Sequence, residues 1–224
     1  MNTDELIDRL SRDLTVVKPL SAPGVRTVLW LAWAAMYLVA VPAVIFATRP
    51  TAGVTATPLF LLQQGAALVT GLLAARAALA SVIPGASHRA WVPPAIGVTM
   101  WVASLLSAVV PDLRAFGTLA FTSERDWPCV ASIAMGGIVL GLPLILMVRR
   151  GAPLTPRATA GLAGLAALSV ANMEACLTRP HAIVLTVLLW HGGTIAIVAA
   201  LCAMLGRRWL RWPPHESMPD AGGL

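Results

Sequence analysis

The sequence predicts an all-α, polytopic membrane protein, a bundle of six transmembrane helices preceded by a short amphipathic cytoplasmic helix. Of its 224 residues, 58% are hydrophobic and only 12% are charged, whereas soluble domains carry about 25% charged residues. The apolar residues gather in six stretches, and the first 20 positions form the one long polar segment ahead of them. A chain of this composition cannot cover a water-facing globule.

Six predominantly apolar segments are the predicted spans, because a helix needs roughly 20 such residues to cross the hydrocarbon core. They are residues 28–47, 58–82, 91–110, 129–148, 159–176 and 182–205. Helix breakers such as Pro84-Gly85 and Pro111-Asp112 separate them. The fifth span is the weakest, since it is rich in Ala and Gly. Tryptophans fall near span ends, as an interfacial aromatic belt requires: Trp30, Trp33, Trp91, Trp127, Trp209 and Trp212.

Lys and Arg residues predict the orientation of the bundle. Twelve lie on the side of the two termini and four lie on the opposite side. Because segments rich in Lys and Arg stay in the cytoplasm, both termini are expected there. The chain then divides into a cytoplasmic tail at 1–27, a transmembrane domain at 28–206 and a cytoplasmic C-terminal tail at 207–224. This topology explains the net charge of +6, so no direct contact with nucleic acid is expected.

Catalytic and ion-coupling motifs are missing from the sequence. It contains no phosphate loop, nucleophile elbow, metalloprotease motif or dinucleotide fingerprint, so neither an enzyme nor a cofactor is expected. His191 is the one titratable residue expected deep in a span, and a neutral His hydrogen-bonded between helices is favoured over a ligand role. The alternative function is a small transporter or metal-handling protein in which Gln63, Gln64 and His191 line a path. A membrane scaffold without signal input is a third possibility.

The predicted topology places two of the three cysteines at the same outer surface. Cys129 begins the fourth span and Cys176 ends the fifth, whereas Cys202 lies near the cytoplasmic end of the last. Thiols that face an oxidising compartment are candidates for a disulfide or for binding a soft metal ion. Glu174 and His181 lie in the same outer segment and are candidates for completing a metal site. Packing of small apolar residues at span ends is the competing interpretation.

The N-terminal segment predicts a short amphipathic helix that Pro19 stops. Apolar residues recur at helical spacing with acidic residues between them: Leu6, Ile7, Leu10 and Leu14, with Asp4, Glu5 and Asp8. Helices that lie on membranes usually have a basic polar face, but the polar face here carries mostly acids. A hydrophobic groove on a soluble protein partner is therefore favoured over the membrane surface.

Four short motifs give the chain a family resemblance. They are TDELIDRL at 3–10, RRGAPL at 149–154, LLWHG at 188–192 and GRR at 206–208. In this order, over nearly the whole chain, they resemble the NrsF-type negative regulators of sigma factor, which are six-span anti-sigma factors of the bacterial inner membrane. In that family a Cys-Pro-His-like segment precedes the last span, and here Cys176 is displaced from Pro180 and His181.

The resemblance implies that the N-terminal segment holds an extracytoplasmic-function sigma factor at the membrane. It also implies a pair of outer-face cysteines, matched by Cys129 and Cys176. The hypothesis is that a redox or metal signal acts on this pair and the tail then releases the sigma factor. The docking residues are Leu6, Ile7, Leu10 and Leu14, and Asp4, Glu5 and Asp8 pair with basic residues of the sigma factor.

Overall fold

The protein is described by a computed structural model, which covers residues 3–12, 20–49, 56–83, 85, 88–117, 127–151, 153–179 and 183–210. Its helices are α1 (Thr3–Arg12), α2 (Pro23–Thr48), α3 (Pro58–Ala80), the 3₁₀ turn η1 (His88–Trp91), α4 (Val92–Phe116), α5 (Trp127–Arg149) and α6 (Pro156–Thr178). The last span consists of α7 (Val184–Thr186), the π-helix η3 (Val187–His191) and α8 (Gly192–Trp209). The described residues contain no strand, and six helical segments are long and apolar enough to cross a membrane.

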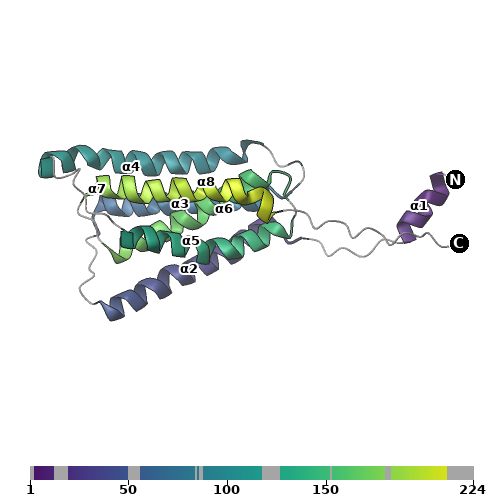
Figure 1. The fold of residues 1–224 in the computed structure, drawn as a ribbon, viewed down its shortest axis with the longest axis horizontal. Coiled ribbons are helices and arrows are strands. Elements are labelled where there is room, and N and C mark those ends of the chain that lie inside the picture. Colours follow the sequence, from purple (N-terminus) through teal and green to yellow (C-terminus); the bar gives the residue numbers. More distant parts are fainter. Residues whose placement is uncertain are drawn as a thin grey trace.

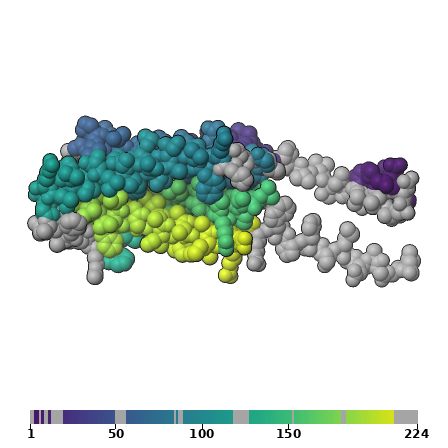
Figure 2. All heavy atoms as spheres, turned by 90° about the horizontal axis from the view of Figure 1, so that it is seen from above, coloured from purple at the N-terminus to yellow at the C-terminus, as the bar shows by residue number. Residues whose placement is uncertain are grey.

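The chain is thus a multi-pass membrane protein, and the predicted fold class is confirmed. Successive spans run in opposite directions, so α2 begins and α8 ends at one end of the bundle, here called the terminal end (Figure 1). Helix α1 lies beyond that end (Figure 1). The opposite end is called the far end. In the space-filling view the spans form one elongated body (Figure 2).

Helix α4 continues past the breaker that was expected to end it. The sequence places the end of this span at Val110, but the helix runs through Pro111 to Phe116 and ends at Gly117, where φ is +55°. The extension brings Asp112 to the start of the last span, where its carboxylate accepts a hydrogen bond from the backbone N–H of Val184 at 2.6 Å. Asp112 therefore satisfies a donor that the first turn of a helix leaves open.

Helix α6 is the centre of the bundle and contacts α2, α3, α5 and α8 (Figure 1). Of its membrane-spanning window 78% is buried by protein, against 22–44% for the other spans, although it is the least apolar of the six. Its small residues permit this burial: a Cβ on Gly164 would lie 3.1 Å from the sulfur of Cys202. Ala160 and Ala167 are buried as well. Close packing, which small residues favour in membranes, compensates for the weak hydropathy.

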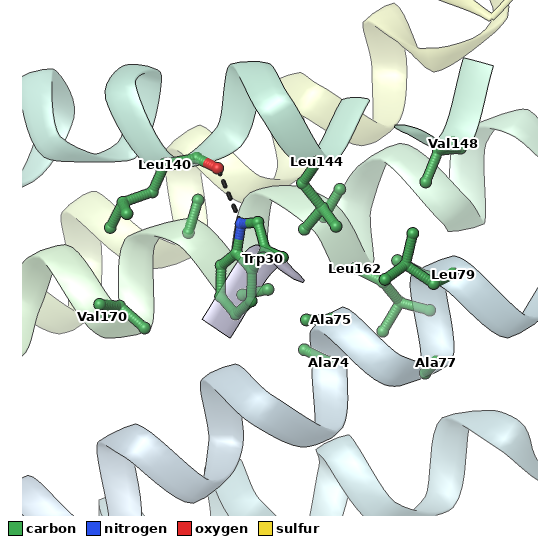
Figure 3. Close-up of a cluster of buried hydrophobic side chains, with 14 of the residues drawn as sticks. Trp30, Ala74, Ala75, Ala77, Leu79, Leu140, Leu144, Val148, Leu162 and Val170 are labelled. Atoms are coloured by element: carbon green, nitrogen blue, oxygen red, sulfur yellow. Dashed lines mark hydrogen bonds between the residues drawn. The ribbon is translucent and has the colours of Figure 1, made fainter. Parts of the chain in front are cut away.

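Two tryptophans of α2 donate hydrogen bonds to the backbone of α5. Trp30 is fully buried, and its Nε1 lies 2.9 Å from the carbonyl oxygen of Leu140 (Figure 3). The Nε1 of Trp33 lies 3.2 Å from the carbonyl oxygen of Val139. Four residues further on, Pro143 has no N–H to offer that carbonyl. Trp33 therefore satisfies an acceptor that the proline leaves open.

The burial of Trp30 corrects the expectation that it belongs to an interfacial belt, because its hydrogen-bond partner lies inside the bundle (Figure 3). The other described tryptophans of that set are 37–61% exposed, as a belt requires: Trp33, Trp91, Trp127 and Trp209. Trp212 lies outside the described residues.

Arg26 joins three helices at the terminal end. It lies in the first turn of α2 and is 5% exposed. Its Nη2 donates to the carbonyl oxygen of Leu79 at 3.1 Å, and its Nη1 donates to that of Met147 at 3.5 Å. These carbonyls belong to the last turns of α3 and α5, which leave acceptors open and carry the negative end of the helix dipole. The first turn of α2 is thereby fixed to the ends of both helices.

Candidate functional site

Helix α1 carries the residues predicted to bind a partner. Asp4 and Glu5 lie in its first turn, and their side chains are exposed, as are those of Ile7 and Asp8. Arg12 and Asp8, one turn apart, form a salt bridge at 3.3 Å, and an exposed pair of this kind contributes little to stability. Ile7 is 58% exposed, which leaves an apolar side chain available for contact.

The register of α1 separates its apolar and acidic residues. At 100° per residue, positions 6, 7 and 10 fall on one side of the helix and positions 4, 5 and 8 on the other. Leu6 and Leu10 both lie within the helix, whereas Leu14 lies outside the described residues. Ten residues are too few for a stable isolated helix in water, so contact with a partner is expected to stabilise α1.

The chain rejoins the bundle beside the Arg26 contacts. A Cβ on Gly151 would lie 3.1 Å from Leu20 Cδ2 and 2.8 Å from Val82, so Leu20 lies between the end of α3 and the α5–α6 connection. Three residues later α2 begins at Pro23. The segment that leads from α1 therefore reaches the bundle where α2, α3 and α5 meet.

At the far end, Cys176 belongs to a buried cluster with Asn172 and His191, here called the thiol cluster. The Sγ of Cys176 lies 3.6 Å from Nδ1 of His191, and that nitrogen lies 2.8 Å from Oδ1 of Asn172. An amide oxygen only accepts hydrogen bonds, so the ring donates from Nδ1. The expected hydrogen bond of His191 between helices is confirmed, since Asn172 lies on α6 and His191 ends the π-helix.

The local backbone marks this cluster as unusual. A π-turn within an α-helix is rare and is frequently found at functional sites. Asn172 also lines a cavity of about 300 Å³ between α3, α4, α6 and α8, together with Trp101 and Gly192. A small molecule in this cavity would lie beside the thiol cluster.

Glu174 is the centre of a second buried group, here called the carboxylate network. Its Oε2 accepts from the hydroxyls of Ser132 on α5 at 2.9 Å and Tyr37 on α2 at 3.3 Å. Its Oε1 accepts from Thr178 one turn further along α6 at 3.1 Å. Three hydroxyl donors thus satisfy a fully buried carboxylate and connect three helices.

The two cysteines predicted to sense a signal both lie at the far end as buried thiols. Cys129 lies one turn before Ser132, on the side of α5 that faces Glu174. Cys176 contacts the last span instead, on the other side of α6 from Glu174. Cys202 lies against Gly164 in the half of α8 nearer the terminal end.

The predicted metal ligands do not form a compact group in the part of the chain that the structure describes. No three His, Cys, Asp or Glu side chains there are arranged to hold a metal ion. His181 lies outside the described residues, so the four-ligand set of Cys129, Cys176, Glu174 and His181 stays a prediction. Asn172, Tyr37 and Ser132 were not singled out from the sequence. For Asn172 the available signal was a cluster of polar residues at 172, 174, 176 and 178 in one span, since polar residues in spans face the bundle interior; the sequence contained no comparable signal for Tyr37 or Ser132.

The glutamines that a transport path was expected to use are buried between helices. Nε2 of Gln63 on α3 donates to the carbonyl oxygen of Ser104 on α4 at 3.4 Å. Gln64 is also buried. This is the interhelical role that polar residues commonly have in membrane bundles.

The fold and the site define a six-span membrane protein with a short exposed amphipathic helix outside the bundle and buried polar clusters within it. The family model described as "Negative regulator of sigma F" matches residues 10–212, and the chain belongs to this NrsF family. A relative from Azospira oryzae, "Probable anti-sigma-F factor NrsF", is 28% identical over 218 residues, which is 95% of this chain and 100% of the relative. No solved structure matches. The family match begins at Leu10, so Asp4, Glu5 and Asp8 precede it.

Proposed function

We propose that this protein is a membrane-bound anti-sigma factor that sequesters an extracytoplasmic-function sigma factor at a bacterial inner membrane, with both termini in the cytoplasm. Membership in a family of negative regulators of sigma F carries the proposal, and the name of the Azospira relative agrees with it. The excess of Lys and Arg at the terminal end supports the orientation. The protein acts in this scheme by binding and not by catalysis.

The sigma factor is held by α1. The apolar side of α1 formed by Leu6, Ile7 and Leu10 enters a groove on the sigma factor, together with Leu14, which lies outside the described residues. Asp4, Glu5 and Asp8 pair with basic residues around the groove. The exposure of Ile7 and of the acids supports this arrangement. Burial of an apolar face also provides the contact that a ten-residue helix needs.

Co-purification of the full-length membrane protein with the sigma factor tests the docking residues. Leu10→Asp places a charge on the apolar side and is expected to abolish retention of the sigma factor. Arg12→Asp places an aspartate two positions away, within the exposed acidic side of the helix, and is expected to retain it. Equal retention by both variants would show that the apolar side is not the contact surface.

Release follows when a periplasmic oxidant or soft metal ion acts on Cys129 and Cys176. The thiolate is the form that reacts with both reagents. The N–H of His191 that donates to Asn172 lies within 3.6 Å of Sγ of Cys176, so a thiolate there can share it. The cavity that Asn172 lines offers a small reagent a place beside the thiol cluster. A change at either thiol alters how α5 or the last span packs on α6.

The change reaches the tail along the contacts of α2 with α5 and α6. Four α2 side chains make these contacts. From the far end to the terminal end, Tyr37 binds Glu174 of α6, and Trp33, Trp30 and Arg26 each donate a hydrogen bond to a carbonyl oxygen of α5. The last of them lies six residues after Leu20, where the tail joins the bundle. Release requires α1 to bind the sigma factor more weakly in the signalled state, by a few kcal/mol.

Thiol mass spectrometry during release tests the sensing step. Exposure of membranes to an oxidant or to a soft metal ion should modify or protect Cys129 and Cys176 as the sigma factor leaves. Under the same treatment, the Cys129→Ser variant and the Cys176→Ser variant should each retain the sigma factor. The Cys202→Ser variant should release it as the unmodified protein does. Release with both far-end thiols unchanged would remove them from the mechanism while leaving the docking proposal intact.

A further inference from the structure

A groove of about 610 Å³ runs between α5, α6 and α8 and has no role in the proposed function. Its floor contains glycines from two helices, Gly137 and Gly141 on α5 and Gly164 on α6. The larger side chains along it face outward, with Ile138 at 61% and Leu201 at 44% exposure. In a multi-pass membrane protein such a groove opens toward the lipid.

The terminal end of the groove carries positive charge. Arg149 ends α5 and Arg208 lies in the last turn of α8, and both line the groove with exposed side chains. Neither has an acidic partner in the described part of the chain. Trp209 lies beside them and is 41% exposed, as is typical of a tryptophan at the membrane–water interface. The groove thus combines an apolar slot with two cations at headgroup depth.

We propose that this groove binds an anionic phospholipid, with an acyl chain along the glycine floor and the phosphate between Arg149 and Arg208. The apolar interior suits a hydrocarbon chain, and basic pockets between transmembrane helices are a known mode of binding acidic headgroups. The guanidinium groups donate hydrogen bonds to phosphate oxygens in addition to supplying charge.

A second copy of the chain fits the groove less well. Two membrane-embedded copies related by a twofold axis along the membrane normal present the same surface to each other, which brings both Arg149–Arg208 pairs to the same depth. Four guanidinium groups would then approach one another, and the described part of the groove contains no acid to neutralise them. A phosphate removes this repulsion, whereas a second copy increases it.

Native mass spectrometry of the purified full-length protein, titrated with phosphatidylglycerol or with zwitterionic phosphatidylethanolamine, tests the proposal. Arg149→Gln with Arg208→Gln is expected to weaken phosphatidylglycerol binding about 30-fold, from two basic contacts near the membrane surface. The matched control is Arg150→Gln with Arg207→Gln. It removes the same charge from adjacent exposed positions that do not line the groove, and binding should change by less than about threefold.

Gly141→Leu tests the slot separately from the charge. A Cβ at this position would lie 3.5 Å from Cβ of Ala167, an ordinary contact, so the bundle should accommodate it while the longer side chain fills the groove. Binding of phosphatidylglycerol should fall with both arginines intact, and an unchanged elution volume and melting temperature would show that the fold persists. The proposal would be overturned if the two double-arginine variants lost phosphatidylglycerol binding equally, or if the protein bound both lipids equally. It would also be overturned if the protein were a dimer that Gly141→Leu dissociates.

Discussion

The carboxylate network makes a quantitative prediction about how α2, α5 and α6 are held together. Glu174→Ala removes the acceptor of two hydroxyls from neighbouring helices, Ser132 at 2.9 Å and Tyr37 at 3.3 Å. A hydrogen bond to a charged group contributes about 1.5–3 kcal/mol in soluble proteins. Between transmembrane helices, double-mutant cycles average about 0.6 kcal/mol with a maximum near 1.7 kcal/mol.

The two distances separate the expected values. The short Ser132 bond should approach the upper limit, with a coupling free energy to Glu174 of about 1.5 kcal/mol. The longer Tyr37 bond should be near the average, at about 0.6 kcal/mol. Thr178 should couple least, because its hydroxyl also lies 3.0 Å from the backbone carbonyl oxygen of Glu174, which the alanine variant retains.

Equilibrium unfolding in detergent micelles measures these couplings. Each cycle combines Glu174→Ala with Ser132→Ala or with Tyr37→Phe, and Ser107→Ala is the control. The hydroxyl of Ser107 donates at 2.8 Å to the carbonyl oxygen of Ser104 on its own helix and should show no coupling. A Ser132 coupling within the roughly 0.3–0.5 kcal/mol scatter of independent sites would refute the assigned bonds. A Tyr37 coupling larger than the Ser132 coupling would refute them as well.

Two further variants test the helix contacts. Asp112→Ala should destabilise the protein by about 1 kcal/mol, since a helix N-terminus loses its acceptor; hydrogen exchange of the Val184 amide should accelerate, and Asp112→Asn should largely prevent this. Trp30→Phe should lower the free energy of unfolding by roughly 1–3 kcal/mol, chiefly through one lost buried hydrogen bond. The matched comparison is Trp91→Phe, at a 46% exposed position, and an equal loss there would contradict the assigned role.

The spans were predictable because contact with lipid imposes hydropathy, and in five of the six spans less than half of the membrane-spanning window is buried by protein. The end of α4 was not predictable from Pro111 alone. A proline removes one hydrogen bond, but Asp112 and the last span recover an interaction at the extension. That compensation comes from a residue 72 positions away in the chain, which local reading does not reveal.

The polar groups inside the bundle were only partly predictable. The sequence indicated that Glu174 and Cys176 share the far end, and it grouped them as candidate ligands. Residues two positions apart on a helix do not face each other, so Glu174 contacts α2 and α5 whereas Cys176 contacts His191. Which helix each side chain meets depends on how six spans pack, and periodicity within one span does not contain that information.

The central position of α6 also determines which substitutions the protein tolerates. A lipid-facing position on α2 or α5 accepts almost any apolar side chain, because the bilayer adapts to its shape. A position on α6 meets protein on every side, so an added methylene group must displace a neighbour. Among homologous chains, side-chain volume should therefore vary less on α6 than on the outer spans, whose lipid-facing positions are constrained in polarity more than in volume.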